Sequence, residues 1–213
     1  MGRSKMLGVL LALVLVASAS RQAYAQSGTA PHVSIGGFWS SNVARVALSP
    51  STGDVGSRQW MGGGATVNVP LAGIVSIDAR AMWNRKGARL PIAGTSGFQD
   101  VSADYLSFPL LAKASMRGPV RLYGVGGVEW AARTKARVRT VLGAIEIEED
   151  ASALVRRSDL ALDFGAGVER TLGASQVFVE GLYAYGLRNV TPDPASTDSA
   201  RTRTFTLLAG LRF

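Results

Sequence analysis

The fold is most readily inferred from residues 202–213, Thr202-Arg203-Thr204-Phe205-Thr206-Leu207-Leu208-Ala209-Gly210-Leu211-Arg212-Phe213. One parity of this stretch is apolar and the other mostly polar: Phe205, Leu207, Ala209, Leu211 and Phe213 against Thr204, Thr206, Leu208, Gly210 and Arg212. A period of two is that of a β-strand, whose successive side chains point to opposite faces. An apolar stripe that runs to a final Phe favours a strand whose apolar face meets lipid. A soluble sheet gives the same alternation, so the rest of the chain is needed to choose between them.

The first 25 residues have the pattern of a secretory signal peptide. Arg3 and Lys5 precede the apolar run Met6 to Val16, and Ala23-Tyr24-Ala25 places small residues at the two recognition positions before Gln26. This pattern predicts export with cleavage after Ala25. We therefore expect a signal peptide over residues 1–25 and a single domain over residues 26–213.

Composition limits the function further. The 213 residues include no cysteine, which excludes a disulfide framework and a thiolate site. The formal net charge is +8, and removal of Arg3, Lys5 and Arg21 with the signal peptide lowers it to +5. The remaining Lys and Arg residues are scattered along the chain, which disfavours nucleic-acid binding.

Seven more stretches repeat the alternation of the last one. They lie at about 32–42, 60–69, 74–84, 104–113, 120–133, 159–171 and 176–187. The connections between them alternate long and short, with long ones expected at about 86–100, 136–155 and 188–200. Within the second of these, residues 138–148 could extend the flanking strands beyond the membrane. Since no helical period is sustained after residue 26, the sequence predicts eight antiparallel strands in an up-and-down meander.

The distribution of charge over these strands favours a membrane barrel over a soluble one. Nine charged side chains share the polar parity: Asp78, Glu129, Asp163, Glu169, Glu180, Arg80, Lys113, Arg121 and Arg212. The other parity carries aliphatic residues together with Trp39, Trp83, Trp130, Tyr183, Tyr185, Phe205 and Phe213. Lipid cannot hydrogen-bond an open sheet edge, so such strands have to close into a barrel. We expect charges that pair inside a narrow lumen and aromatic residues at the lipid interface.

With these residues in view, the chain resembles the PorT-like family of small outer-membrane β-barrels, relatives of the OmpA/OmpX-like eight-stranded group. The resemblance is carried by the stretches 104–113 (Asp-Tyr-Leu-Ser-Phe-Pro-Leu-Leu-Ala-Lys), 122–127, 163–169, 179–190 and 207–213. It implies location in the outer membrane, contact with outer-membrane lipid, and insertion by the barrel assembly machinery guided by the last strand ending at Phe213. It implies no reaction.

The residues themselves predict no catalytic site, no cofactor and no metal. His32, the only histidine, stands at the start of the first strand, where an interfacial role is favoured over that of a general base. Asp163, Glu169 and Glu180 are better explained as structural ion pairs than as an acid/base pair. The run Glu146 to Asp150 lacks the ligand spacing of a calcium loop, and no helix follows the glycines of residues 124–127 to bind a dinucleotide.

Three functions remain open from the sequence. The first is a non-enzymatic outer-membrane barrel with a side-chain-filled lumen and four external loops, in a structural, adhesive or accessory role. The second is a narrow passive channel, because charges on the inner wall serve conduction if they are wet. The third is a secreted, lipocalin-like binding barrel, in which the charged face meets water and the apolar face meets a ligand.

Overall fold

The computed structural model describes residues 32–49, 58–92, 94–95, 97–143, 145–152, 157–187 and 199–213. The predicted signal peptide lies outside the described residues. The strands are β1 (Ser34–Ser49), β2 (Arg58–Ala72), β3 (Val75–Pro91), β4 (Phe98–Ser115), β5 (Val120–Leu142), β6 (Ile145–Asp150), β7 (Ser158–Leu172), β8 (Ser175–Gly186) and β9 (Ser199–Arg212). The described residues contain no helix long and apolar enough to cross a membrane.

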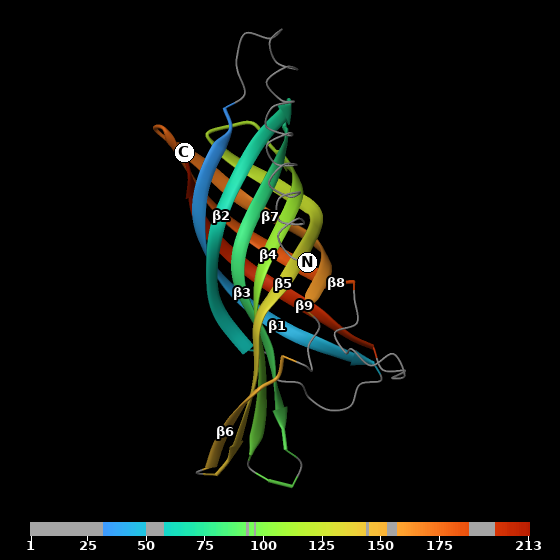
Figure 1. The fold of residues 1–213 in the computed structure, drawn as a ribbon. Helices are drawn as coiled ribbons and strands as arrows, with labels where there is room; N and C mark the ends of the chain where they lie inside the picture. Colours follow the sequence, from blue (N-terminus) through green and yellow to red (C-terminus); the bar gives the residue numbers. More distant parts are fainter. Residues whose placement is uncertain are drawn as a thin grey trace.

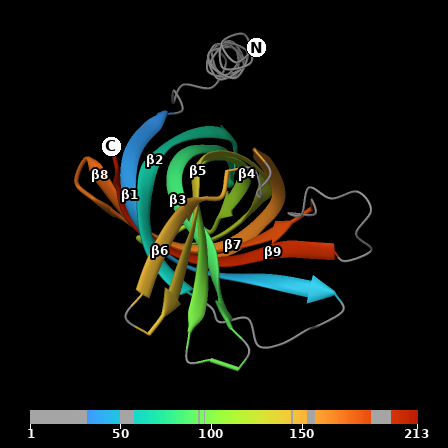
Figure 2. The same ribbon diagram turned by 60° about the horizontal axis from the view of Figure 1, so that its bottom comes forward.

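Eight of these strands close a ring. Each pairs antiparallel with its neighbours in the order β1-β2-β3-β4-β5-β7-β8-β9, and β9 pairs back with β1. Figure 2 shows this ring around a central axis. Ile35 and Phe213 complete the closure by exchanging two backbone hydrogen bonds of 3.0 and 2.9 Å. The predicted eight-stranded antiparallel up-and-down barrel is confirmed. Its last strand, β9, closes the ring by pairing with β1.

The predicted parity also holds around the ring. In β9 the side chains of Thr204, Thr206 and Leu208 are buried, whereas Phe205 and Leu207 are about half exposed. Strands β3, β4, β7 and β8 alternate in the same sense. The buried parity faces the lumen and the exposed parity forms an apolar outer wall. This polarity is the reverse of a lipocalin-like barrel.

Pro109 lies within an interior strand, where its missing N–H interrupts one ladder. Strand β4 pairs with β3 on one side and β5 on the other, but the β3 register jumps from Ala79↔Leu110 to Met82↔Ser107. The ladder with β5 is continuous through Pro109↔Glu129. Proline is tolerated here because the gap is confined to one edge of β4.

Two of the connections expected to be long loops are largely strand. Residues 86–100 continue β3 to Pro91 and begin β4 at Phe98, so the predicted loop there is wrong. Residues 138–142 extend β5, as expected, whereas residues 145–150 form an additional strand, β6, that was not predicted. The acidic run is part of this strand instead of a solvated loop. Polar residues in alternation resemble a loop in sequence, but cross-strand pairing satisfies their backbone groups. Most of the predicted loop at 188–200 lies outside the described residues.

Together these extensions form a four-stranded sheet beyond the barrel. Residues 85–91 of β3 pair with 98–104 of β4, residues 98–104 pair with 135–141 of β5, and β5 pairs with β6. We call this part the projecting sheet. Figure 1 shows it extending from the end of the barrel opposite the C-terminus. The tight turns Gly73-Ile74, Gly118-Pro119 and Gly173-Ala174 lie at the other end, as predicted from the short connections.

Candidate functional site

The lumen is crossed by ion pairs between strands far apart in the sequence. Arg80 on β3 donates to both carboxylate oxygens of Glu180 on β8, at 2.6 and 2.7 Å, and to Asp78 at 2.9 Å. All three side chains are fully shielded from solvent. A bidentate pair of this kind is among the stronger protein hydrogen-bonding arrangements, and it offsets the cost of burying the charges. The predicted pairing of inward charges is confirmed here.

A second group of charges adjoins the first toward the turn end. Arg212 donates to Asp78 at 2.6 Å and lies 3.5 Å from Glu169. Glu169 also accepts from Lys113 and, on its other oxygen, lies 3.2 Å from the Nε of Arg121. One carboxylate therefore faces three cations. Residues from β3, β4, β5, β7 and β9 meet at this point because the ring brings their strand ends together.

A third group lies toward the projecting sheet. Lys86 on β3 donates to Glu129 at 3.2 Å and lies 3.9 Å from Asp159 on β7. Sequence reasoning placed Lys86 in a loop and missed it, although its even parity continues that of Asp78, Arg80 and the buried Asn84. The signal was present in the alternation, but Gly87 and Pro91 obscured it.

Aromatic rings fill the space between the charged groups. Lys113 lies 4.2 Å above the Tyr123 ring and Arg212 lies 4.2 Å above that of Phe178. Both rings are held against glycines: a Cβ at Gly167 would be 2.5 Å from Tyr123, and one at Gly210 would be 2.6 Å from Phe178. Cation and ring contacts add to the stabilisation of the buried charges. The arrangement leaves the middle of the barrel occupied by side chains.

Asp163 is the exception among the predicted inner charges. It is buried at 2% exposure, yet within the described residues neither of its carboxylate oxygens has a hydrogen-bond partner. Glu169 and Glu180 take part in ion pairs, so the three carboxylates do not form one site. Isolated buried polar groups of this kind are places where internal water is expected.

The projecting sheet carries charge on one face and apolar groups on the other. Arg137 pairs with Glu148 at 3.1 Å and Arg139 with Glu146 at 2.6 Å, while Arg85 bridges Asp104 at 2.5 Å. A hollow of about 230 Å³ lies along this charged face. The opposite face exposes Leu142, Ile145 and Ile147 at 40–63%.

Two of these surface groups have shifted pKa values with local causes. Hydrogen bonds from Ser152 hold the pKa of Asp150 below its usual value, and the backbone N–H of Ser152 lies 2.7 Å from the carboxylate. The hydrogen bond to Glu146 raises the pKa of Arg139. Both groups are charged at neutral pH, which keeps this face ionic.

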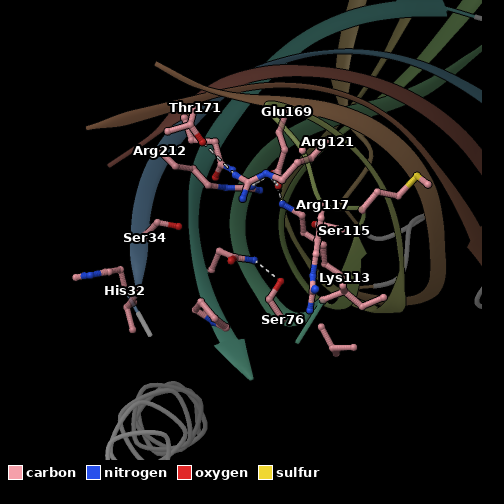
Figure 3. A pocket seen from close by; sticks show the side chains of 18 of the residues that line it. His32, Ser34, Ser76, Lys113, Ser115, Arg117, Arg121, Glu169, Thr171 and Arg212 are labelled. Carbon is pink, nitrogen blue, oxygen red and sulfur yellow. Dashed lines mark hydrogen bonds and ion pairs between the residues drawn. The ribbon is translucent and has the colours of Figure 1, made fainter. Parts of the chain in front are cut away.

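At the turn end the lumen opens into a basin of about 620 Å³. Its wall includes Lys113, Arg117, Arg121, Glu169 and Arg212. His32 also lines it, at the mouth and exposed, as expected for a residue just before β1. Figure 3 shows Glu169, Arg121 and Arg212 close together on one wall, with Ser34 and His32 on another side. In the described part of the chain no group of three or more His, Asp or Glu side chains is arranged to hold a metal ion.

The sequence matches the family model of the outer membrane protein beta-barrel domain over residues 9–213. The chain belongs to this family. As a member of the outer membrane protein beta-barrel family it lies in the outer membrane, where lipid covers the exposed apolar wall. Five of the seven aromatic residues predicted to face lipid are 43–82% exposed in the isolated chain: Trp39, Trp83, Trp130, Phe205 and Phe213. The other two, Tyr183 and Tyr185, are partly buried.

Solved barrels of similar fold have low sequence identity to this family member. Ail, the attachment invasion locus protein of Yersinia pestis, crystallised with the heparin analogue sucrose octasulfate, is 14% identical with a TM-score of 0.46, covering 85% of this chain and 99% of its own. Neisserial surface protein A is 14% identical with a TM-score of 0.44, covering 84% and 95%. The N-terminal barrel of Pseudomonas aeruginosa OprF is 11% identical with a TM-score of 0.38, covering 84% and 97%. No curated protein matches the chain.

Proposed function

We propose that this family member is a non-enzymatic barrel that closes its own lumen and displays the projecting sheet as an external interaction platform, in a structural, adhesive or accessory role. The observation that carries the proposal is the Arg80–Glu180–Asp78 group, whose side chains are fully shielded from solvent in the centre of the barrel. An eight-stranded lumen is only wide enough for side chains to fill it. The surface outside the barrel is therefore the part that remains available to contact partners.

The absence of catalysis is part of this proposal. Glu169 and Glu180 serve as acceptors in buried ion pairs, which fixes their orientation. His32 lies exposed at the mouth of the basin. A general base needs a nucleophile or substrate proton within hydrogen-bond reach. The lining of the basin supplies cations and hydroxyls in place of a base paired with a nucleophile.

The projecting sheet has the features of an interaction surface. Its β6 residues are exposed throughout, and one face is ionic while the other shows Leu142, Ile145 and Ile147. Contiguous exposed apolar groups next to charges are typical of binding surfaces. Its short, charged strand β6 also limits uncontrolled pairing of the edge.

Export and insertion complete the proposal. The signal peptide of residues 1–25 would direct the chain across the inner membrane, with cleavage after Ala25. The barrel assembly machinery would then recognise β9, whose Phe213 terminates the seam strand. Assignment to the PorT-like subgroup rests on residues 104–113, 122–127, 163–169, 179–190 and 207–213. In the first of these, Pro109 keeps its pairing with β5.

Single cysteines test the proposed placement directly, because the native chain has none. Ile147 in β6 is exposed, and Ser175, the first residue of β8 beside the Gly173-Ala174 turn, is partly exposed. A membrane-impermeant maleimide reports the accessibility of Ile147→Cys and Ser175→Cys. We expect Ile147→Cys to be labelled on intact cells and Ser175→Cys only after lysis. Labelling with the opposite preference would show that the projecting sheet faces the periplasm and would end the platform proposal.

A narrow passive channel is the second candidate, and Asp163 is the observation that favours it. A buried carboxylate without a partner in the described residues indicates room for water in the middle of the lumen. Conduction requires in addition that water passes the Arg80–Glu180 pair. The conductance measurement described at the end of the Discussion distinguishes the two functions.

A further inference from the structure

The basin at the turn end carries more positive charge than its own acidic groups neutralise. Arg80 and Arg212 are balanced by Asp78 and Glu180, two cations to two carboxylates. Of the other charged groups that line the basin, Lys113, Arg117 and Arg121 face Glu169 and the α-carboxylate of Phe213. Three cations minus two carboxylates leave an excess of one positive charge. An uncompensated excess of this kind in a concave site attracts anions.

The excess lies where a ligand can reach it. The Arg121 side chain is 32% exposed, and Arg117 is exposed in the turn between β4 and β5. Of the five N–H donors of Arg121, Nε is directed to Glu169 and one on Nη2 to Thr171 at 3.3 Å. Arg117 stands at the rim beside Ser115 (Figure 3). Arginine donors at the mouth of the basin thus remain available to an incoming acceptor.

We propose that this basin binds a phosphate-bearing anion, with Arg117 and Arg121 as its principal ligands. The guanidinium fork matches phosphate geometry, and donors that converge from several strands suit an acceptor with several oxygens. The hydroxyls of Ser34, Ser115 and Thr171 add neutral donors to the wall. A volume of about 620 Å³ accommodates a phosphate together with an organic substituent.

Two sources supply such a phosphate at the turn end: a free phosphate compound in solution, or the headgroup of an anionic phospholipid in the surrounding leaflet. The chemistry of recognition is the same for both. The site is independent of the projecting sheet, which lies at the opposite end of the barrel (Figure 1). Failure of this binding proposal would therefore leave the proposed function intact, and failure of the proposed function would leave this binding proposal intact.

The test uses the full mature chain, refolded, with Arg117→Gln, Arg121→Gln and the double variant. Arg139→Gln is the matched control for each single variant, because it also removes one positive charge, from the projecting sheet. A heat-modifiability gel first verifies that each variant is folded. If Arg121→Gln fails to fold, Arg117→Gln in its exposed turn carries the test alone.

In the first arm, calorimetry measures binding of inorganic phosphate to barrels in an uncharged detergent at constant ionic strength. In the second arm, native mass spectrometry measures phosphatidylglycerol retained by barrels released from phosphatidylcholine nanodiscs that contain it. The double variant should weaken phosphate binding or lipid retention by about tenfold or more, as expected for loss of charge-assisted hydrogen bonds. Arg139→Gln should leave both unchanged.

An Arg117- and Arg121-dependent signal in the first arm identifies a soluble phosphate compound, and a signal in the second arm alone identifies a lipid headgroup. Either result supports the proposal. It is overturned if neither probe binds, or if Arg139→Gln weakens binding as much as the double variant does, because binding would then reflect net charge and not this basin.

Discussion

Arg80 is the centre of an ion-pair group that crosses the lumen of the barrel. It bridges Glu180, 100 residues away, and its near neighbour Asp78, with no solvent access to any of the three side chains. Removing one partner from such a group leaves a charge buried without compensation, whereas removing both opposing partners does not. We therefore expect single and paired substitutions in this group to differ in their effect on the free energy of unfolding.

Arg80→Met should lower the free energy of unfolding by about 3–5 kcal/mol, because Glu180 loses its buried partner. Arg80→Met combined with Glu180→Leu should recover most of that loss. Urea unfolding of the refolded barrel in lipid vesicles, followed by tryptophan fluorescence, measures both. The control is Arg137→Met, whose pair with Glu148 is half exposed and should contribute no more than about 1 kcal/mol. Equal effects of Arg80→Met and Arg137→Met would contradict a closed, dry ion pair.

Gly167 tests the packing of the lumen. A Cβ at this position would lie 2.5 Å from the Tyr123 ring and 2.6 Å from the carbonyl oxygen of Val179. Gly167→Ala should therefore cost about 1–3 kcal/mol through overpacking. Gly124→Ala is the control, since its Cβ would meet nothing closer than 3.9 Å. Equal shifts in the urea midpoint of the two variants would show that the lumen around Tyr123 has room for the added methyl group.

At the scale of elements, the hairpin of β5 and β6 is the part of the sheet that depends on a local backbone conformation. Six register pairs join the two strands, from Arg137↔Asp150 to Leu142↔Ile145. Gly143, at the turn, has φ of 60°, a left-handed conformation that side chains branched at Cβ avoid. The hairpin can thus be perturbed without touching the barrel.

Gly143→Val should accelerate amide hydrogen exchange in β6 and at the adjoining end of β5, while exchange in residues 122–128 of the barrel wall stays slow. Leu142→Val, next to it in an extended strand, should change neither region. Hydrogen exchange with mass spectrometry on the refolded protein reads out both. Unchanged exchange in β6 would mean that the hairpin does not depend on this turn.

The sequence predicted faces better than it predicted element ends. Alternation placed Asp78, Arg80 and Glu180 on the inner wall, because strand periodicity is local. Which carboxylate meets which cation depends on the closed ring, so the Arg80–Glu180 pair was beyond local patterns. Lys86 was assigned to a loop, and β6 was not predicted as a strand. Their polar residues and nearby glycines resemble loops, whereas cross-strand pairing makes them strand. The basin requires the turns and termini to meet at one end, which no single stretch encodes.

At the scale of the whole molecule, two ends with different chemistry flank a closed middle. The projecting sheet ends in paired surface charges and exposed apolar groups, and the basin at the turn end has an excess of positive charge. Between them, three groups of ion pairs and the rings of Tyr123 and Phe178 occupy the lumen. In the proposed function, a barrel built in this way separates its two surfaces and does not connect them.

In the proposed function, the closed middle of the barrel does not conduct ions. Planar-bilayer recording on the refolded chain from Gln26, with a heat-modifiability gel on the same sample to verify a folded barrel, tests it most directly. The account predicts a heat-modifiable species that inserts without steady conductance. Stable single-channel steps from that same species would contradict it, and they would show that the inner charges line a wet pathway through the membrane.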